Sequence, residues 1–460
     1  MVASLVAIIA AITGIPTGVI AALYDFALRR LWLAFLLLPL LVPSFLGAIG
    51  LSMLRRAVRL PPDTVLSGFG GTVITFSALA VPLVIFISFA AARAISASQT
   101  DAARLAGGEV HLFTCVTKSI LPIGVSTAAL AGVLTLSDPG AGQILGFPGA
   151  AAEILTSFAA RYDIGQATAQ CFVLAGIVLL LALPLAILIA PKLATGLLAR
   201  DVTPGRLRHT HLINGLAPLL CCVLFAVTTA LPLAGFVGPV LRETPWRRAL
   251  EEVHRTLGYT FAYALLAAVI ATTVGFALAV AAGRDNKLRA ILLASLTIIF
   301  ALPPALGALG FIHAANVSPA EFDLLLRSRF TVGLDLALRA LPIAAIFGMR
   351  AVGTASPSWA EAAAVHGVRL TTYLRKVLWP WLLPAMMVSA LLTALLVTAD
   401  VTTVLLLHPP GETSLPLAIF TVMANAPEPL VGALCLFYIG GAAMTLMFGL
   451  AVLNLAGRKR

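Results

Sequence analysis

The chain has 460 residues, of which 60% are hydrophobic and only 11% are charged. Soluble domains carry about 25% charged residues, so the composition excludes an ordinary soluble fold and predicts an all-α polytopic membrane protein. The net charge of +11 would suit nucleic-acid binding, but basic residues that border apolar segments more often set membrane orientation. We therefore expect membrane lipid as a partner and no nucleic acid.

Apolar segments of membrane-spanning length recur along the whole chain and predict about eleven spanning helices. The first segment has no basic residues ahead of it, so a cleavable signal peptide is not expected. Pro39 and Pro43 lie inside the second segment and should interrupt its backbone hydrogen bonds. The predicted spans are 3–23, 31–54, 72–95, 120–137, 171–193, 212–236, 258–283, 289–313, 331–352, 381–405 and 432–455.

An internal repeat relates the two parts of the chain at an offset of 260 residues (361 − 101 = 260). Composition bias could align alanines and leucines, but it would not place Asp, Pro and Gly in register. We therefore divide the chain into a first repeat, 1–200, and a second repeat, 201–460. Segment 212–236 has no counterpart between Met1 and residue 200, so the first repeat shows no first helix in this sequence. Either such a helix precedes Met1 or the repeat lacks it, and both alternatives stay open. The matched pairs include Asp25 and Asp285, Arg29 and Arg289, Pro43 and Pro303, Gly47 and Gly307, and Pro82 and Pro342.

Two polar segments at matched positions interrupt the apolar sequence. They are DAARLAGGEVHLFTCVTKSILP, from Asp101 to Pro122, and EAAAVHGVRLTTYLRKVLWP, from Glu361 to Pro380. Placing both in the cytosol puts all lysines on the cytosolic side, as membrane orientation requires. The two repeats are then parallel, related by an axis along the membrane normal.

Each polar segment predicts a short exposed helix followed by a bend. In the second one, Ser358 should cap a helix that starts near Ala360, with Glu361 in the first turn at the positive end of the helix dipole. Gly367, six residues after the acid, allows a tight bend. A rigid exposed helix of this kind can insert into a cleft of another protein.

The pattern of acid, two alanines and a later glycine resembles the cytoplasmic EAA loop of ABC importer permeases. Two copies resemble the fused, type I importer-like permeases of the iron(III)/thiamine/phosphonate family. The second copy departs from the family pattern at Trp379, and the first has Asp for Glu and two extra residues before Pro122. The resemblance implies an ATPase-coupling role for Glu361, Ala362, Ala363, Gly367, Asp101, Ala102, Ala103 and Gly107.

The same resemblance implies the partners and the location. It implies a cytosolic ABC ATPase dimer, a periplasmic or extracellular substrate-binding protein, and the bacterial cytoplasmic (inner) membrane. The chain has no GxxxxGK[ST] motif, and the dipeptide Gly-Lys does not occur in it, so no phosphate-binding loop of that kind is expected. ATP and Mg are therefore expected on the partner subunit, with no cofactor in this chain.

No catalytic residue or metal site is expected. The five cysteines show no CxxC spacing and are interpreted as packing residues, and His209 and His211 fall in a linker.

Ionisable residues within spans are candidates for transport. Asp138 and Asp400 each follow the span after a polar segment, and we expect them to line the outer mouth of a translocation path. Exposure to interfacial water is the alternative. Asp335 and Arg339 are four residues apart on one predicted helix and should form a structural salt bridge. Segment 238–257 could form an amphipathic interfacial helix.

These features favour the transmembrane subunit of a binding-protein-dependent ABC importer. The alternative is a secondary active transporter with parallel repeats, which would need charges in the middle of its spans. A membrane enzyme would need clustered His, Asp or Glu at the membrane surface. The substrate stays open among iron(III), thiamine, phosphonates and polyamines.

Overall fold

The computed structural model describes residues 1–198 and 211–458, and within them the regular elements are helices. Nine of these helices are long and apolar enough to cross a membrane, and two bent helix pairs raise the number of possible spans among the described residues to eleven. The prediction of an all-α, multi-pass membrane protein is confirmed. The proposed repeat boundary at residue 200 and His209 lie outside the described residues.

The elements before the undescribed linker are α1 (Val2–Leu23), α2 (Arg29–Leu37), η1 (Leu38–Leu41), α3 (Ser44–Ala57), α4 (Gly68–Arg93), α5 (Ala97–Leu134), η2 (Thr135–Ser137), α6 (Gly140–Leu145), α7 (Ala150–Ala159) and α8 (Ile164–Leu198). Those after it are α9 (His211–Phe225), η3 (Ala226–Ala230), α10 (Leu231–Glu243), α11 (Trp246–Ala282), α12 (Asn286–Ala301), α13 (Pro304–Val317), η4 (Ala320–Phe322), α14 (Asp323–Leu326), α15 (Arg329–Thr354), α16 (Pro357–Val365), α17 (Leu370–Tyr373), η5 (Leu374–Leu378), α18 (Trp379–Thr398), α19 (Val401–Leu407), α20 (Leu415–Val422) and α21 (Glu428–Arg458).

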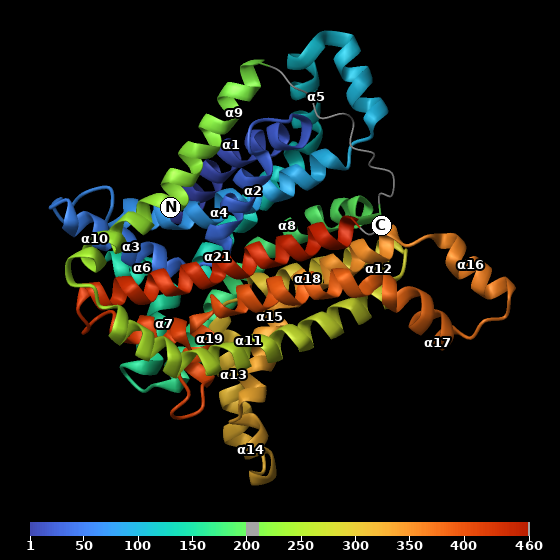
Figure 1. Cartoon of the computed structure of the whole chain (residues 1–460). Helices are drawn as coiled ribbons and strands as arrows, with labels where there is room; N and C mark the ends of the chain where they lie inside the picture. Colours follow the sequence, from blue (N-terminus) through green and yellow to red (C-terminus); the bar gives the residue numbers. More distant parts are fainter. Residues whose placement is uncertain (199–210, 459–460) are drawn as a thin grey trace.

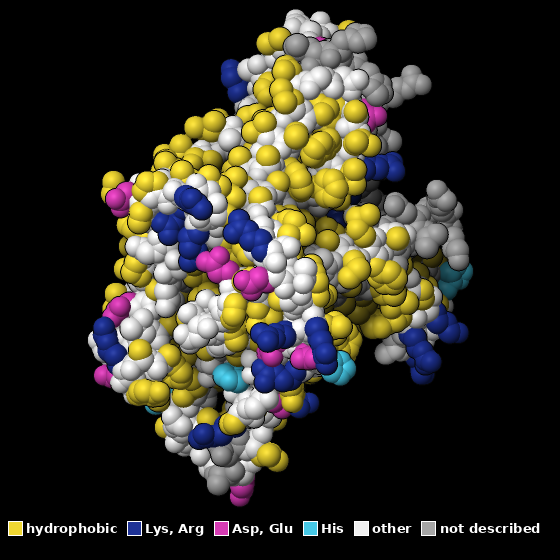
Figure 2. Space-filling model, turned by 60° about the vertical axis from the view of Figure 1, so that its left-hand side comes forward, with side chains coloured by type: hydrophobic (Ala, Val, Ile, Leu, Met, Phe, Trp, Pro, Cys, Tyr) yellow, Lys and Arg dark blue, Asp and Glu magenta, His cyan; other side chains and the backbone are white. Residues whose placement is uncertain are grey.

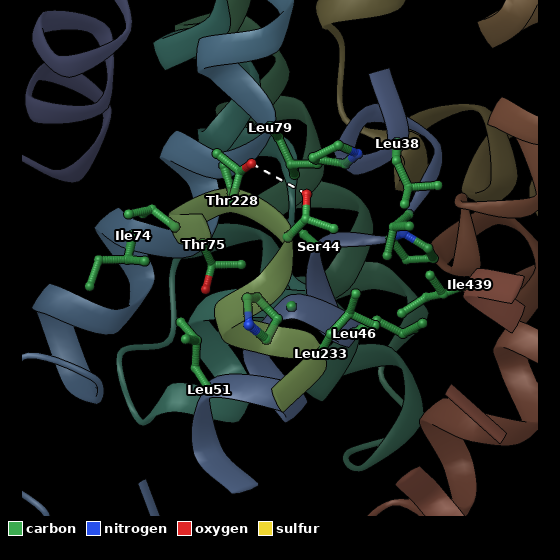
Figure 3. Close-up of a pocket in the computed structure, with 18 of the residues that line it drawn as sticks. Leu38, Ser44, Leu46, Leu51, Ile74, Thr75, Leu79, Thr228, Leu233 and Ile439 are labelled. Carbon is green, nitrogen blue, oxygen red and sulfur yellow. Dashed lines mark hydrogen bonds between the residues drawn. The ribbon is translucent and has the colours of Figure 1, made fainter. Parts of the chain in front are cut away.

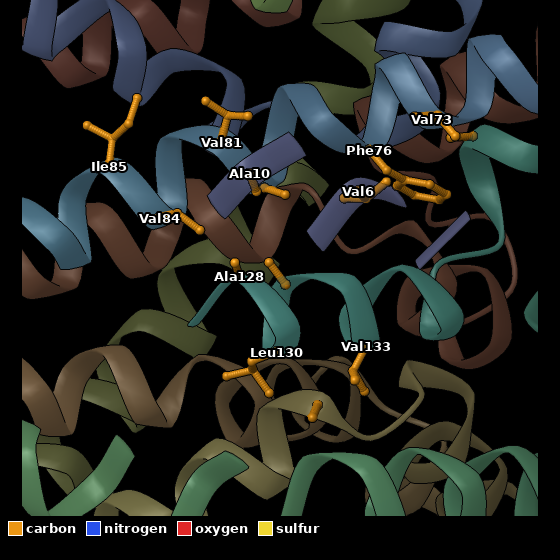
Figure 4. Packing of buried hydrophobic residues seen from close by; sticks show 14 of the residues in the cluster. Val6, Ala10, Val73, Phe76, Val81, Val84, Ile85, Ala128, Leu130 and Val133 are labelled. Carbon is orange, nitrogen blue, oxygen red and sulfur yellow. The ribbon is translucent and has the colours of Figure 1, made fainter. Parts of the chain in front are cut away.

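Two similar helix bundles form the centre of the molecule (Figure 1). In the first, α1 packs against α4 and α5, as the buried side chains in Figure 4 show. In the second, α11 packs against α15 and α18. Small residues permit the close approach, since a Cβ added at Gly18 of α1 would lie 2.6 Å from the Ile85 carbonyl oxygen of α4.

Both bundles contain a spanning segment that is broken at a matched proline. The axes of the two helical parts meet at 97° around Pro43, and those of α12 and α13 meet at 83° around Pro303. The two prolines have almost the same backbone angles, φ −55° and ψ 143° at Pro43 and φ −56° and ψ 135° at Pro303. A ψ in this range is outside the helical region, and proline lacks the N–H that would continue the helix. The interruption expected near Pro43 is confirmed.

Helices are exchanged between the two parts of the chain. Helix α10, from the segment without a counterpart, packs between α3 and α21, and α8 packs along α12. Each broken segment is thus covered by a helix from the other part of the chain.

Two expectations about the outer segments are wrong. Residues from Trp246 onward do not form a separate interfacial helix, because α11 runs without interruption from Trp246 to Ala282 and buries Ala249. The predicted span 381–405 also ends too late, since α18 stops at Thr398 and Asp400 starts the short helix α19. Asp400 accepts a hydrogen bond from the Thr403 backbone N–H at 3.1 Å, which explains the new helix start.

Candidate docking loops and central charged cluster

The downstream loop, residues 356–378, projects from the right-hand end of the molecule in Figure 1. None of the residues of α16 or α17 is buried. Gly367 follows α16 with φ +63°, and a Cβ placed there would have no atom within 4 Å. The bend expected at Gly367 is therefore present, and glycine is favoured there by its backbone conformation and not by lack of space.

The start of α16 differs from the expectation. The N-cap is Ser356, Pro357 is the first helical residue, and the Ser356 and Ser358 hydroxyls lie 2.6 Å apart. Proline suits the first helical position because its missing N–H would be unpaired there in any case. Glu361 consequently lies beyond the first turn, where the helix dipole has little influence on it.

The upstream loop, residues 96–118, projects at the upper right of the molecule in Figure 1 and bends within α5. Ser96 caps this helix by accepting a hydrogen bond from the Gln99 backbone N–H at 3.4 Å. At the bend, Gly107 has φ −164° and Gly108 has φ +72°. The glycine with positive φ is therefore Gly108, one residue after the position that the repeat predicts.

Both loops expose the residues that the motif singles out. Asp101, Ala102, Glu361 and Ala362 are exposed, and Ala103 and Ala363 are half-buried. Large apolar side chains stand next to both bends, with Leu105 89% and Val365 84% exposed. Exposed apolar residues on projecting helices are typical of surfaces that contact another protein.

The second feature is a cluster of charges near the ends of α15, α18 and η2. The Arg339 Nε lies 2.8 Å from the Asp400 Oδ2, and both side chains are largely buried. The expected pair of Arg339 with Asp335 is wrong, since Arg339 turns to Asp400 and Asp335 accepts a hydrogen bond from the Thr403 hydroxyl at 3.1 Å. A Cβ at Gly307 would lie 2.1 Å from the Asp335 Oδ1, so α13 packs directly on this carboxylate.

Asp138 belongs to the same cluster, although it lies far from the others in sequence. It is within electrostatic range of Asp400 and Arg339. Its Oδ1 accepts hydrogen bonds from the Ser44 hydroxyl and the Gly140 N–H, both at 2.8 Å. Next to it, the Ser137 hydroxyl donates to the Ala301 carbonyl at 3.0 Å. Asp138 and Asp400 thus meet where the two parts of the chain make contact.

An apolar pocket lies beside the break at Pro43, between α3, α4 and the η3–α10 segment (Figure 3). Its polar lining includes Thr75, Thr228 and Thr229, and the last two hydroxyls lie 3.3 Å apart. Thr75 corresponds to Asp335 at the repeat offset. The pocket beside Pro43 is therefore apolar, whereas the matched position in the second part of the chain carries a carboxylate. Sequence patterns could not reveal the pocket, because its walls come from three distant segments.

The opposite end of the molecule carries paired charges. Arg56 and Glu428 lie 2.7 Å apart, and Arg329 and Glu412 lie 2.6 Å apart. Figure 2 turns this end forward and shows acidic and basic side chains gathered among hydrophobic ones. Among the described residues, no group of three or more His, Cys, Asp or Glu side chains is arranged to hold a metal ion.

Comparison with known proteins found no matching family model, no similar curated protein and no similar solved structure. The function of this chain is therefore inferred from its own geometry and from the two EAA-like segments.

Proposed function

We propose that this chain is the transmembrane subunit of a binding-protein-dependent ABC importer, with two parallel permease repeats, and that a separate cytosolic ATPase drives it. One observation carries the proposal: two helical loops at matched positions project from the molecule, and each bends at a glycine with positive φ next to exposed apolar residues. A membrane channel needs no such pair of projections, whereas a subunit driven from outside needs a contact on each half.

Similar contacts of two matched arginines, whose acceptors differ by two residues in register, support the repeat. The Arg29 Nε donates to the Ala21 carbonyl at 2.8 Å, and the matched Arg289 Nε donates to the Gly283 carbonyl at 2.8 Å. Each arginine therefore ties the broken segment back to the end of the preceding helix. The breaks at Pro43 and Pro303 are a second matched feature.

In the proposed mechanism, the ATPase moves both loops and thereby shifts the two bundles relative to each other. Asp138 and Asp400 lie at the contact between the bundles, where a path along the repeat axis would run. We place the translocation path there, with an external binding protein delivering substrate to the opposite end. The substrate class stays open.

A mild-detergent purification of the tagged chain from its native membrane tests the proposal. Wild type should bring down a nucleotide-binding subunit, and Gly367→Asp should weaken or abolish that recovery while the chain still inserts in the membrane. Gly411→Asp is a suitable control, because Gly411 also has a positive φ (+82°), a Cβ there has no atom within 4 Å, and it lies in the exposed segment between α19 and α20, away from both loops. Absence of any ATPase with wild type, in membranes that express one, would contradict the importer.

The secondary active transporter is the second candidate, and one observation favours it. Asp335 is only 3% exposed within the spanning helix α15, and buried acids in spans often carry coupling protons. Uptake that follows an ion gradient and persists without ATP would favour this candidate.

A further inference from the structure

The two docking loops are joined to the transmembrane helices by different side-chain chemistry. In the upstream loop, the Arg104 Nη1 lies 3.1 Å from the Asp101 Oδ1 and its Nε lies 3.3 Å from the Glu109 Oε1. Glu109 in turn accepts a hydrogen bond at 3.0 Å from the hydroxyl of Tyr24, a buried residue at the end of α1. This chain of contacts connects both arms of the upstream loop to the core, and we call it the ionic joint.

The downstream loop has aromatic residues in this role. The rings of Trp359 in α16 and Trp381 in α18 meet edge to face, with centroids 5.1 Å apart and planes at 79°. The Trp381 Nε1 donates to the Ala351 carbonyl of α15 at 3.1 Å, and both rings pack against a buried cluster that includes Ala351. We call this contact the aromatic joint.

The repeat offset shows that the difference is systematic. Trp359 corresponds to the exposed Gln99 at the repeat offset. After the bend the register is shifted by one residue, so Glu109, directly after Gly108, corresponds to the exposed Val368, directly after Gly367. Tyr24 corresponds to Arg284, which donates to the Gly353 and Ala355 carbonyls at the end of α15 and not to a loop side chain. Among the described residues, Arg369 and Glu361 form no ion pair, so the downstream loop has no counterpart of the ionic joint.

We propose that the two docking loops are coupled to the membrane helices unequally, through an ionic joint upstream that salt weakens and an aromatic joint downstream that salt leaves intact. Ions screen charge pairs that water can reach, and the Debye length falls to about 3 Å at 1 M salt. The Asp101 side chain is 63% exposed, so salt can reach its pair with Arg104. The Arg104 Nε and the Glu109 Oε1 are buried, so salt acts on the joint through its Asp101 end. Edge-to-face aromatic contacts depend on apolar burial and ring quadrupoles, which salt does not screen.

The consequence for transport rests on the proposed docking role of the loops. High ionic strength would loosen the path from the ATPase to the first bundle while the path to the second bundle stays rigid. The difference in the joints is itself independent of the importer assignment, so it can be tested on the purified chain alone.

The test uses spin labels at Leu105 and Val365, the exposed positions next to the two bends, in a cysteine-free background. Raising NaCl from about 0.05 M to 1 M should increase the mobility of the label at Leu105 and leave the label at Val365 unchanged. Glu109→Gln should make the Leu105 label mobile at low salt and abolish its salt response. Trp359→Ala should free the Val365 label at every salt concentration.

Matched controls come from the same two loops. Arg369→Gln removes an exposed charge just after the downstream bend, and Gln99→Ala is the counterpart of Trp359→Ala; neither should change either label. An equal salt response of both labels, or an unchanged Leu105 label in Glu109→Gln, would overturn the proposal. Because no ATPase is present, this outcome would leave the importer proposal standing, and failure to recover an ATPase would leave the joints standing.

Discussion

Replacing Arg339 by methionine removes the positive charge from the central cluster and leaves Asp400 without its ion-pair partner, within electrostatic range of Asp335 and Asp138. Breaking a fully buried ion pair on one side costs about 3–5 kcal/mol, whereas an exposed pair contributes about 1 kcal/mol or less. The Arg339 and Asp400 side chains are 23% and 13% exposed, which places this pair between the two limits. We therefore expect Arg339→Met to lower the free energy of unfolding by about 2–3 kcal/mol.

Thermal unfolding in mild detergent measures this effect. Unfolding entropy of about 2.1 cal/mol/K per residue makes 1 kcal/mol equivalent to about 1 °C in a chain of this length, so the melting temperature should fall by about 2–3 °C. The double variant Arg339→Met with Asp400→Asn removes the unpaired carboxylate and should recover part of the loss. Arg369→Met is the control, since this arginine is exposed and has no ion pair among the described residues.

The interaction is refuted if the double variant is less stable than Arg339→Met alone. Equal stability of Arg339→Met and wild type would refute it as well, because three neighbouring carboxylates without a cation should repel one another.

Two further predictions concern packing and pH. Gly18→Ala should destabilise the chain by about 1–3 kcal/mol, because the new Cβ would lie 2.6 Å from the Ile85 carbonyl oxygen. Gly176→Ala in α8 is the control: its Cβ would have no atom within 4 Å, so this variant should be neutral or stabilising. The melting temperatures of the two variants test both expectations. Hydrogen bonds from Arg329 hold the pKa of Glu412 below its usual value of 4.5. The ionised carboxylate therefore stabilises the folded state above pH 4.5. This stabilisation is lost as the pH falls through the lowered pKa. Glu412→Gln should therefore lose less stability than wild type when melting is followed from pH 7 to pH 3, and parallel curves would contradict this.

Much of the fold could be predicted because its signals are local. Apolar length predicted the spans, Pro43 marked the interruption of the second span, and Gly367 marked a tight bend, whereas the break at Pro303 was not predicted. Local signals failed where register or long-range contact decides the outcome. The upstream bend lies at Gly108 and not at the expected Gly107. No pattern within α15 indicated that Arg339 would turn to Asp400, which is 61 residues away (400 − 339 = 61).

The proposed importer requires both projecting loops to contact an ATPase, and photo-crosslinking detects that contact in the native membrane. A photoreactive amino acid is placed at Leu105 in the upstream loop, at Val365 in the downstream loop, or at Leu324 as a control. Leu324 is 88% exposed but precedes α15, a helix of 26 residues that separates it from the downstream loop. Irradiated native membranes should give an adduct with a nucleotide-binding subunit from Leu105 and Val365 and none from Leu324. Adducts with such a subunit from neither loop, or from Leu324 as strongly as from the loops, would contradict the account.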